Sequence, residues 1–162
     1  NELILLEAQD RSLWDKELIQ VGYHYLNRAS TGDVISQYHI EAAIAAEHSI
    51  AKSYNETNWE RILSLYDLLT KTNLSPVILL NRSVVLAQLG EIANAITQVL
   101  SIRGIDQLIQ TDHQYASVLG YLYMKLSDRI KAMEYLQQAK SITVSLAEQK
   151  LLQTRIDQLS MN

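Results

Sequence analysis

The sequence predicts an all-α protein built from consecutive pairs of packed helices. Apolar residues advance by steps of three and four along nearly the whole chain, as Leu13, Trp14 and Leu18 do, without sustained alternation at a period of two. The 162 residues include one proline and five glycines, too few turn formers for a fold of many short strands. The second half also carries a repeated pattern of small and large residues.

About eight helices are expected from this periodicity. They span residues 12–30, 36–53, 58–72, 76–89, 91–103, 112–126, 128–141 and 145–160. Three begin with a capping box, in which a hydroxyl accepts a first-turn N–H and an acid reaches back to the cap: Ser12 with Asp15, Thr57 with Glu60, and Ser145 with Glu148. A fourth begins with a serine cap followed by proline, where no N–H is needed, at Ser75 and Pro76.

Glycines are expected in two roles. Gly32, Gly90 and Gly104 fall where helices should end, because glycine accepts the left-handed conformation found there. Gly22 and Gly120 fall inside helical patterns, where glycine costs about 1 kcal/mol relative to alanine. We therefore expect close helix contacts at Gly22 and Gly120.

Residues 113–142 carry the clearest internal repeat. Small and large residues follow the spacing of the tetratricopeptide pattern, at Ala116, Leu119, Gly120, Tyr123, Ala132, Leu136 and Ala139. A weaker copy lies thirty-seven residues earlier, at Leu79, Ser83, Leu86, Ala95 and Val99. The helices at 36–53 and 58–72 are interpreted as a third, degenerate pair, and 145–160 as the capping helix that such an array needs.

The predicted architecture is a single tetratricopeptide-like domain, a right-handed array of helical hairpins over residues 1–162. It consists of an N-terminal linker and helix at 1–34, helix pairs at 35–142, and a C-terminal capping helix at 143–162. The first residue is not methionine, which leads us to expect a piece of a longer protein.

The composition argues against several classes of site. Without cysteine there is no disulfide, zinc–thiolate site or iron–sulfur cluster. The four histidines lack the spacing of a zinc site on a helix, and no phosphate-binding loop, nucleophile elbow or zinc-protease motif occurs. A net charge of −4 is opposite in sign to that of a domain gripping DNA. We expect no enzyme, metal, cofactor or membrane partner, and a cytoplasmic protein.

Several stretches resemble one bacterial family across the whole chain. They are LILLEAQDRSLWD at 3–15, YHIEAAIAAEH at 38–48, TNW at 57–59, LYD at 65–67 and SPVILLNR at 75–82. In order and spacing they are similar to extracytoplasmic-function RNA polymerase sigma factors with a tetratricopeptide-like C-terminal extension. The resemblance implies a regulatory domain for transcription initiation, whose partners are the sigma regions of the same chain, RNA polymerase or a regulator.

Under this resemblance, promoter DNA is read by sigma regions upstream of Asn1, which this chain lacks. The alternative is a free-standing tetratricopeptide adaptor that scaffolds an unrelated protein complex. The reading frame upstream of Asn1 distinguishes the two hypotheses.

Asp10, Arg11, Trp14 and Asp15 form the densest cluster of charged and aromatic residues. Tryptophan and arginine are common anchors in protein interfaces, so the cluster is a candidate docking site for the sigma regions or polymerase. In the structural interpretation, Ser12 and Asp15 cap a helix, Trp14 packs inward, and Asp10 and Arg11 pair with neighbouring residues. The two interpretations are compatible.

The first helix of each tetratricopeptide pair lines a concave groove that binds a peptide or a helix. The register places partner-binding candidates in this groove at Gln88, Gln114, Ser117, Tyr121 and Lys125. The alternative is that the chain's own terminal helices fill the groove.

Arg82 stands where the weaker repeat should have a core leucine. A buried guanidinium needs a carboxylate partner. The sequence therefore predicts a structural ion pair for Arg82. Asp67 on the preceding helix is favoured as its partner over Asp10 and Glu41, and the alternative is an exposed, ligand-binding arginine.

Overall fold

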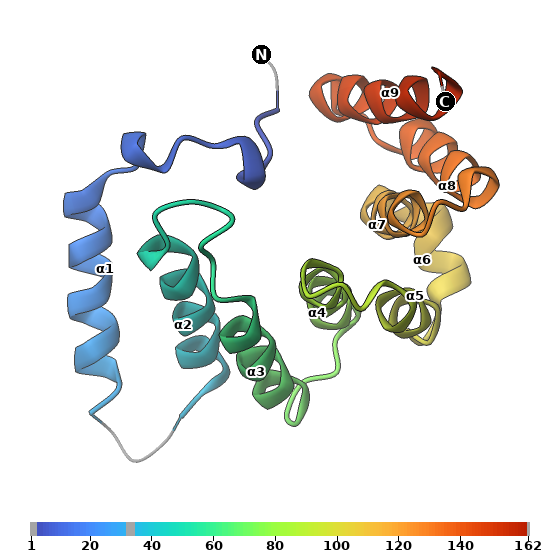
Figure 1. Cartoon of the computed structure of the whole chain (residues 1–162). Helices are drawn as coiled ribbons and strands as arrows, with labels where there is room; N and C mark the ends of the chain where they lie inside the picture. The colour runs from blue at the N-terminus through green and yellow to red at the C-terminus, as the bar shows by residue number, and fades with distance from the viewer. Residues whose placement is uncertain (1–2, 32–34, 162) are drawn as a thin grey trace. The chain divides into compact units, whose positions relative to one another are not determined.

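The computed structural model describes residues 3–31 and 35–161, and all regular structure in them is helical (Figure 1). The described residues form nine α-helices and two 3-10 turns and contain no strand. The all-α class predicted from the sequence is confirmed. Gly32 lies outside the described residues. The chain separates into two compact units, an N-terminal unit over residues 4–74 and a C-terminal unit that begins at Ser75.

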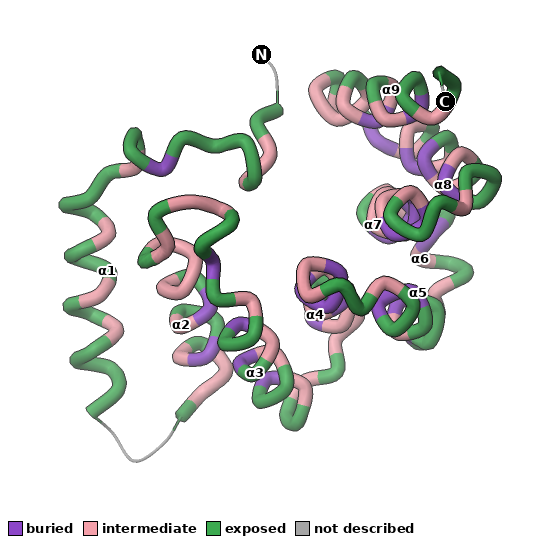
Figure 2. The backbone as a smooth tube through the Cα atoms, viewed as in Figure 1, coloured by how far each residue is buried: buried purple, intermediate pink, exposed green. Residues whose placement is uncertain are grey.

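The described part of the N-terminal unit contains two 3-10 turns and three helices. These elements are Leu6–Ala8 (η1), Arg11–Leu13 (η2), Lys16–Ala29 (α1), Gln37–Ile50 (α2) and Trp59–Thr70 (α3). Helix α2 packs against both α1 and α3. The buried apolar residues come from α2 and α3, namely Ile40, Ile44, Ile62, Leu65 and Leu69 (Figure 2).

Helix α1 contributes no buried residue to this core. It is held at Tyr23, whose Oη lies 3.1 Å from the Ala46 carbonyl oxygen and 2.8 Å from Ser49 Oγ. Gly22 is exposed, and a Cβ built on it would meet no atom within 4 Å. The close contact predicted at Gly22 is wrong, because α1 lies at the edge of the unit and its glycine faces open space.

Two of the predicted helix caps are displaced by a few residues. Asp15, not Ser12, caps α1, because its side chain accepts the Leu18 N–H at 2.9 Å. Asn58, not Thr57, caps α3. Both pairs contain competing cap residues close in sequence, and the Thr57 hydroxyl has another partner, described below.

The described part of the C-terminal unit contains six helices. They are Pro76–Gln88 (α4), Ile92–Leu100 (α5), Ile105–Thr111 (α6), His113–Lys125 (α7), Arg129–Ile142 (α8) and Leu146–Met161 (α9). Helix α4 packs against α5, α7 against α8, and α8 against α9. Along this unit, α4, α7 and α9 follow one another on one side and α5, α6 and α8 on the other (Figure 1). Pro76 is the first residue of α4, as predicted.

The contact between α7 and α8 is tightly packed around Gly120. Ala116, Leu119, Ala132 and Leu136 each have 0% exposed surface. A Cβ added to Gly120 would lie 2.7 Å from Leu136 Cγ and 3.2 Å from the Leu136 backbone nitrogen. The close helix contact predicted at Gly120 is confirmed.

The turns after α4 and after α7 share one hydrogen-bond pattern. In the first, the Gly90 and Glu91 N–H groups donate to the carbonyls of Ala87 and Leu86 at 3.2 and 3.0 Å. In the second, thirty-seven residues later, the Ser127 and Asp128 N–H groups donate to the carbonyls of Met124 and Tyr123, both at 3.0 Å. Each turn is a Schellman motif, with φ of 83° at Gly90 and 62° at Ser127.

Replacement of Ser127 by glycine should stabilise the C-terminal unit by about 1 kcal/mol, because a side chain at positive φ is strained and glycine is not. Thermal melts followed by far-UV circular dichroism measure the effect. Gly90→Ser, the reverse substitution at the equivalent position of the other turn, should lower the melting temperature. Equal melting temperatures for Ser127→Gly and the parent would contradict the prediction.

Helix α6 was not predicted from the sequence. Gly104 was interpreted as the end of a helix, but α5 already ends at Leu100 and Gly104 is the N-cap of α6, with φ of 78°. A glycine in the left-handed conformation can reverse the chain direction before a helix as well as after one. A glycine in the sequence therefore does not show whether a helix begins or ends there. Among the described residues, no helix has both the length and the apolar character required to cross a membrane.

The N-terminus of α9 is fixed by a polar network. Ser145 Oγ accepts the Glu148 N–H at 3.4 Å, as the predicted capping box requires. The Glu148 carboxylate does not reach back to the cap. It binds the Thr143 hydroxyl and lies 3.0 Å from His113 Nε2 at the start of α7.

Candidate protein-interaction surface

Three helices of the C-terminal unit bring polar side chains around Tyr121. Gln88 on α4 donates from Nε2 to the Tyr121 hydroxyl at 3.3 Å. Lys125 Nζ and Arg155 Cζ each lie 5.5 Å from the centre of the Tyr121 ring, a distance typical of cation–π contacts. We call Gln88, Tyr121, Lys125 and Arg155 the Tyr121 face.

The predicted groove residues converge here in part. Gln88 and Lys125 each contact Tyr121, Gln88 at the hydroxyl and Lys125 over the ring. Ser117 is half-buried one turn before Tyr121 on α7, and Gln114 is exposed near the start of that helix. Arg155 on α9 was not predicted, because no motif distinguishes it from the other charged residues of a helix with little amphipathic pattern.

The Tyr121 face contains two cationic side chains, Lys125 and Arg155, in a chain of net charge −4. Helices α4 and α7 contain no aspartate or glutamate. On α9, the Glu148 carboxylate interacts with the Thr143 hydroxyl and the His113 ring. Asp157, also on α9, accepts a hydrogen bond from Gln153 at 2.7 Å. A face with two cations around an aromatic ring favours an acidic partner, because complementary charge steers association.

The predicted acidic residues of the N-terminal cluster are caps. Asp10 caps η2 by accepting the Ser12 N–H at 2.9 Å, and Asp15 caps α1. Hydrogen bonds from the Ser12 side chain and backbone lower the pKa of Asp10 below its ordinary value. Both carboxylates thus have local structural partners, as the structural interpretation expects.

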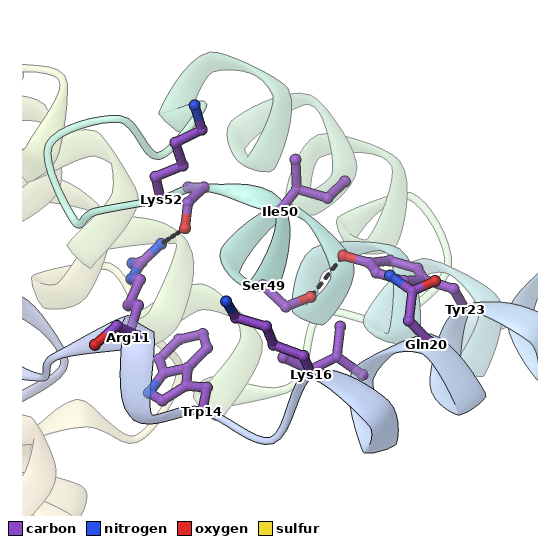
Figure 3. Close-up of a pocket in the computed structure, with 11 residues that line it drawn as sticks. Arg11, Trp14, Lys16, Gln20, Tyr23, Ser49, Ile50 and Lys52 are labelled. Atoms are coloured by element: carbon purple, nitrogen blue, oxygen red, sulfur yellow. Dashed lines mark hydrogen bonds between the residues drawn. The ribbon is translucent and has the colours of Figure 1, made fainter.

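Arg11 fastens the N-terminal segment to the end of α2 (Figure 3). Its Nη1 donates to the carbonyls of His48 and Ala51 at 2.7 and 3.0 Å, and its Nη2 donates to Thr57 Oγ1 at 3.1 Å. The guanidinium lies 5.1 Å from the Trp14 ring centre. Because Ala51 is the C-cap of α2, Arg11 supplies a cation to a helix C-terminus.

His48 adjoins this cluster. Burial lowers the pKa of its imidazole, and the positive charge of Arg11 lowers that pKa further. Both effects favour the neutral form of the His48 imidazole. Its ring packs edge-on against Trp59 with centroids 5.5 Å apart.

Arg82 is half-buried and donates from Nη1 to Gln98 Oε1 on α5. Gln98 in turn donates to the Leu79 carbonyl at 2.6 Å, which ties α5 to α4. Asp67 belongs to the N-terminal unit, so its pairing with Arg82 stays a prediction. No group of three or more metal-ligating side chains occurs in the ranges 3–31 and 35–161.

The chain is similar in sequence to part of a longer bacterial protein. An uncharacterized protein of Rhizobium meliloti (strain 1021) is 29% identical over 160 residues, which cover 98% of this chain and 37% of that protein. No protein-family model and no solved structure matches the chain. The chain is thus similar to little more than one third of a longer bacterial protein.

Proposed function

We propose that this chain is a tetratricopeptide-like array of helix pairs and the regulatory protein-interaction domain of a bacterial RNA polymerase sigma factor of the extracytoplasmic-function type. Two features support the array, namely the Schellman turns thirty-seven residues apart and the buried small and large residues between α7 and α8. The sequence resemblance supports the sigma factor assignment.

The Tyr121 face is the observation that carries the binding function. A half-buried tyrosine flanked by Lys125 and Arg155 suits an acidic segment of the sigma regions, of RNA polymerase or of a regulator. Binding of that segment would favour or disfavour the promoter-competent state, and so modulate transcription initiation in the cytoplasm. Promoter DNA would be bound by the sigma regions, outside this chain.

Site-specific cross-linking tests this function in the full-length protein in its own host. A photoreactive p-benzoylphenylalanine at Tyr121 should capture the sigma regions, RNA polymerase or a transcription regulator, identified by mass spectrometry. Ile130 on α8, 82% exposed, is the matched control position and should capture none of these.

Other outcomes of this experiment overturn the proposal. Capture at Tyr121 only of proteins without a role in transcription would favour a free-standing adaptor. Capture no stronger at Tyr121 than at Ile130 would mean that the Tyr121 face does not bind a partner. The proposal also requires sigma-type regions to be encoded upstream of residue 1, and a start codon immediately before that residue would contradict it.

A further inference from the structure

A pocket of about 470 Å³ lies in the N-terminal unit, between the segment η2–α1 and the end of α2 (Figure 3). This volume is within the range of about 300–1,000 Å³ typical of small-molecule sites. Its lining residues are Arg11, Ser12, Trp14, Lys16, Ile19, Gln20, Tyr23, Ser49, Ile50, Ala51 and Lys52. The pocket is separate from the Tyr121 face, which belongs to the other unit.

The pocket carries three positive charges and no carboxylate in its lining. Arg11 is 8% exposed, and its three hydrogen-bond acceptors are two carbonyls and a hydroxyl, all neutral. A buried cation normally has an anionic partner, because neutral acceptors replace its hydration only in part. Within residues 3–31 and 35–161, Arg11, Lys16 and Lys52 form no ion pair.

The remaining lining is largely apolar and aromatic. Trp14 is half-buried, and Ile50 at the edge of the pocket is 64% exposed. The Tyr23 hydroxyl is fixed 2.8 Å from Ser49 Oγ, so the tyrosine ring forms a rigid part of the wall. Lys16 extends between Trp14 and Ser49 toward the side of the pocket where Arg11 lies, whereas the Lys52 ammonium points outward from the rim (Figure 3).

We propose that this pocket binds a small organic anion, in which an apolar or aromatic body carries a carboxylate, sulfonate or phosphate group. The anionic group lies toward Lys16 and Arg11, Lys52 adds positive charge at the rim, and the apolar body lies against Trp14 and Ile50. Such a ligand neutralises the buried Arg11 charge and covers exposed apolar surface in one step. The inference goes beyond the proposed function and does not depend on it.

A matched pair of fluorescent probes tests the charge requirement. The probe 1-anilinonaphthalene-8-sulfonate carries an anionic group, and N-phenyl-1-naphthylamine is the same ring system without it. The variant Lys16→Gln/Lys52→Gln should weaken binding of the sulfonate probe at least fivefold and change binding of the neutral probe less than twofold. Lys71→Gln, an exposed lysine of the same unit outside the pocket, should change neither.

Nuclear magnetic resonance of the full chain locates the bound probe. The chain has two tryptophans, and the sulfonate probe should shift the indole N–H signal of Trp14, which lines the pocket, and not that of Trp59, which does not. Phenyl phosphate should displace the probe at a concentration at least tenfold lower than inorganic phosphate.

Several results would overturn the inference. Unchanged sulfonate-probe affinity in the double lysine variant would remove the role of the cations. A shift confined to Trp59 would place the probe elsewhere. If phenyl phosphate and inorganic phosphate displaced the sulfonate probe at equal concentrations, the site would bind the anionic group alone, without a contribution from the apolar wall. Circular dichroism of the double variant checks that it remains folded.

Discussion

Replacement of Arg11 by alanine should destabilise the N-terminal unit by about 3 kcal/mol. Hydrogen bonds from a charged donor contribute about 1.5–3 kcal/mol each, but part of this gain is offset by the cost of burying the Arg11 charge, which the alanine variant no longer has. The variant leaves the His48 and Ala51 carbonyls and the Thr57 hydroxyl without their shared donor. It also removes the cation from the C-terminus of α2.

Urea unfolding followed by tryptophan fluorescence measures this loss. Both tryptophans, Trp14 and Trp59, lie in the N-terminal unit, so their emission reports the unfolding of that unit. Arg11→Lys should be almost as unstable as Arg11→Ala, since a lysine ammonium cannot replace the two planar donor nitrogens of the guanidinium. Arg28→Ala, an exposed arginine on α1, is the control and should lie within about 0.5 kcal/mol of the parent. If the urea concentration at the midpoint of unfolding were the same for Arg11→Ala and Arg28→Ala, the three Arg11 hydrogen bonds would contribute nothing to the stability of the unit.

Replacement of Gly120 by alanine should destabilise the C-terminal unit by about 2 kcal/mol, the usual cost of overpacking a closed core. The added methyl would meet Leu136 Cγ at 2.7 Å and the Leu136 backbone nitrogen at 3.2 Å. The leucine end can rotate, but the backbone nitrogen requires α8 to move. This cost exceeds the gain of about 1 kcal/mol that alanine brings to a helix.

Gly22→Ala is the matched control and should have the opposite sign. A Cβ at Gly22 meets nothing within 4 Å, so only the helix-propensity gain of about 1 kcal/mol remains. Far-UV circular dichroism follows the unfolding of both variants. Stabilisation of the protein by Gly120→Ala would refute the close contact between α7 and α8.

The C-terminal unit is the part of the fold that sequence reasoning predicted best. Ala116, Leu119, Ala132 and Leu136 were singled out by their spacing, and all four are fully buried. Their pattern is specific because only small residues let two helices approach closely, and a large residue must then fill each neighbouring hole. Helix α6 escaped prediction because its seven residues are too few to show a period.

The N-terminal unit was predicted less well. Gly22 and Gly120 have the same local sequence signature, and what separates them is whether another helix lies opposite, which is tertiary information. Likewise, the role of Arg11 could not be deduced, because its acceptors at residues 48 and 51 are backbone carbonyls, which every residue has. Arg11 and Trp14 were nevertheless singled out from their residue types, together with Asp10 and Asp15, as a candidate docking cluster.

The Arg11 hydrogen bonds also bear on the order of folding. They join residues 37 to 46 positions apart, whereas α2 and α3 are connected by the short segment 51–58. Because closing a short loop costs less entropy, α2 and α3 can pair before the N-terminal segment docks. Contacts that form after the transition state slow unfolding and leave the folding rate nearly unchanged. Arg11 therefore governs how long the folded N-terminal unit persists and has little influence on how fast it forms.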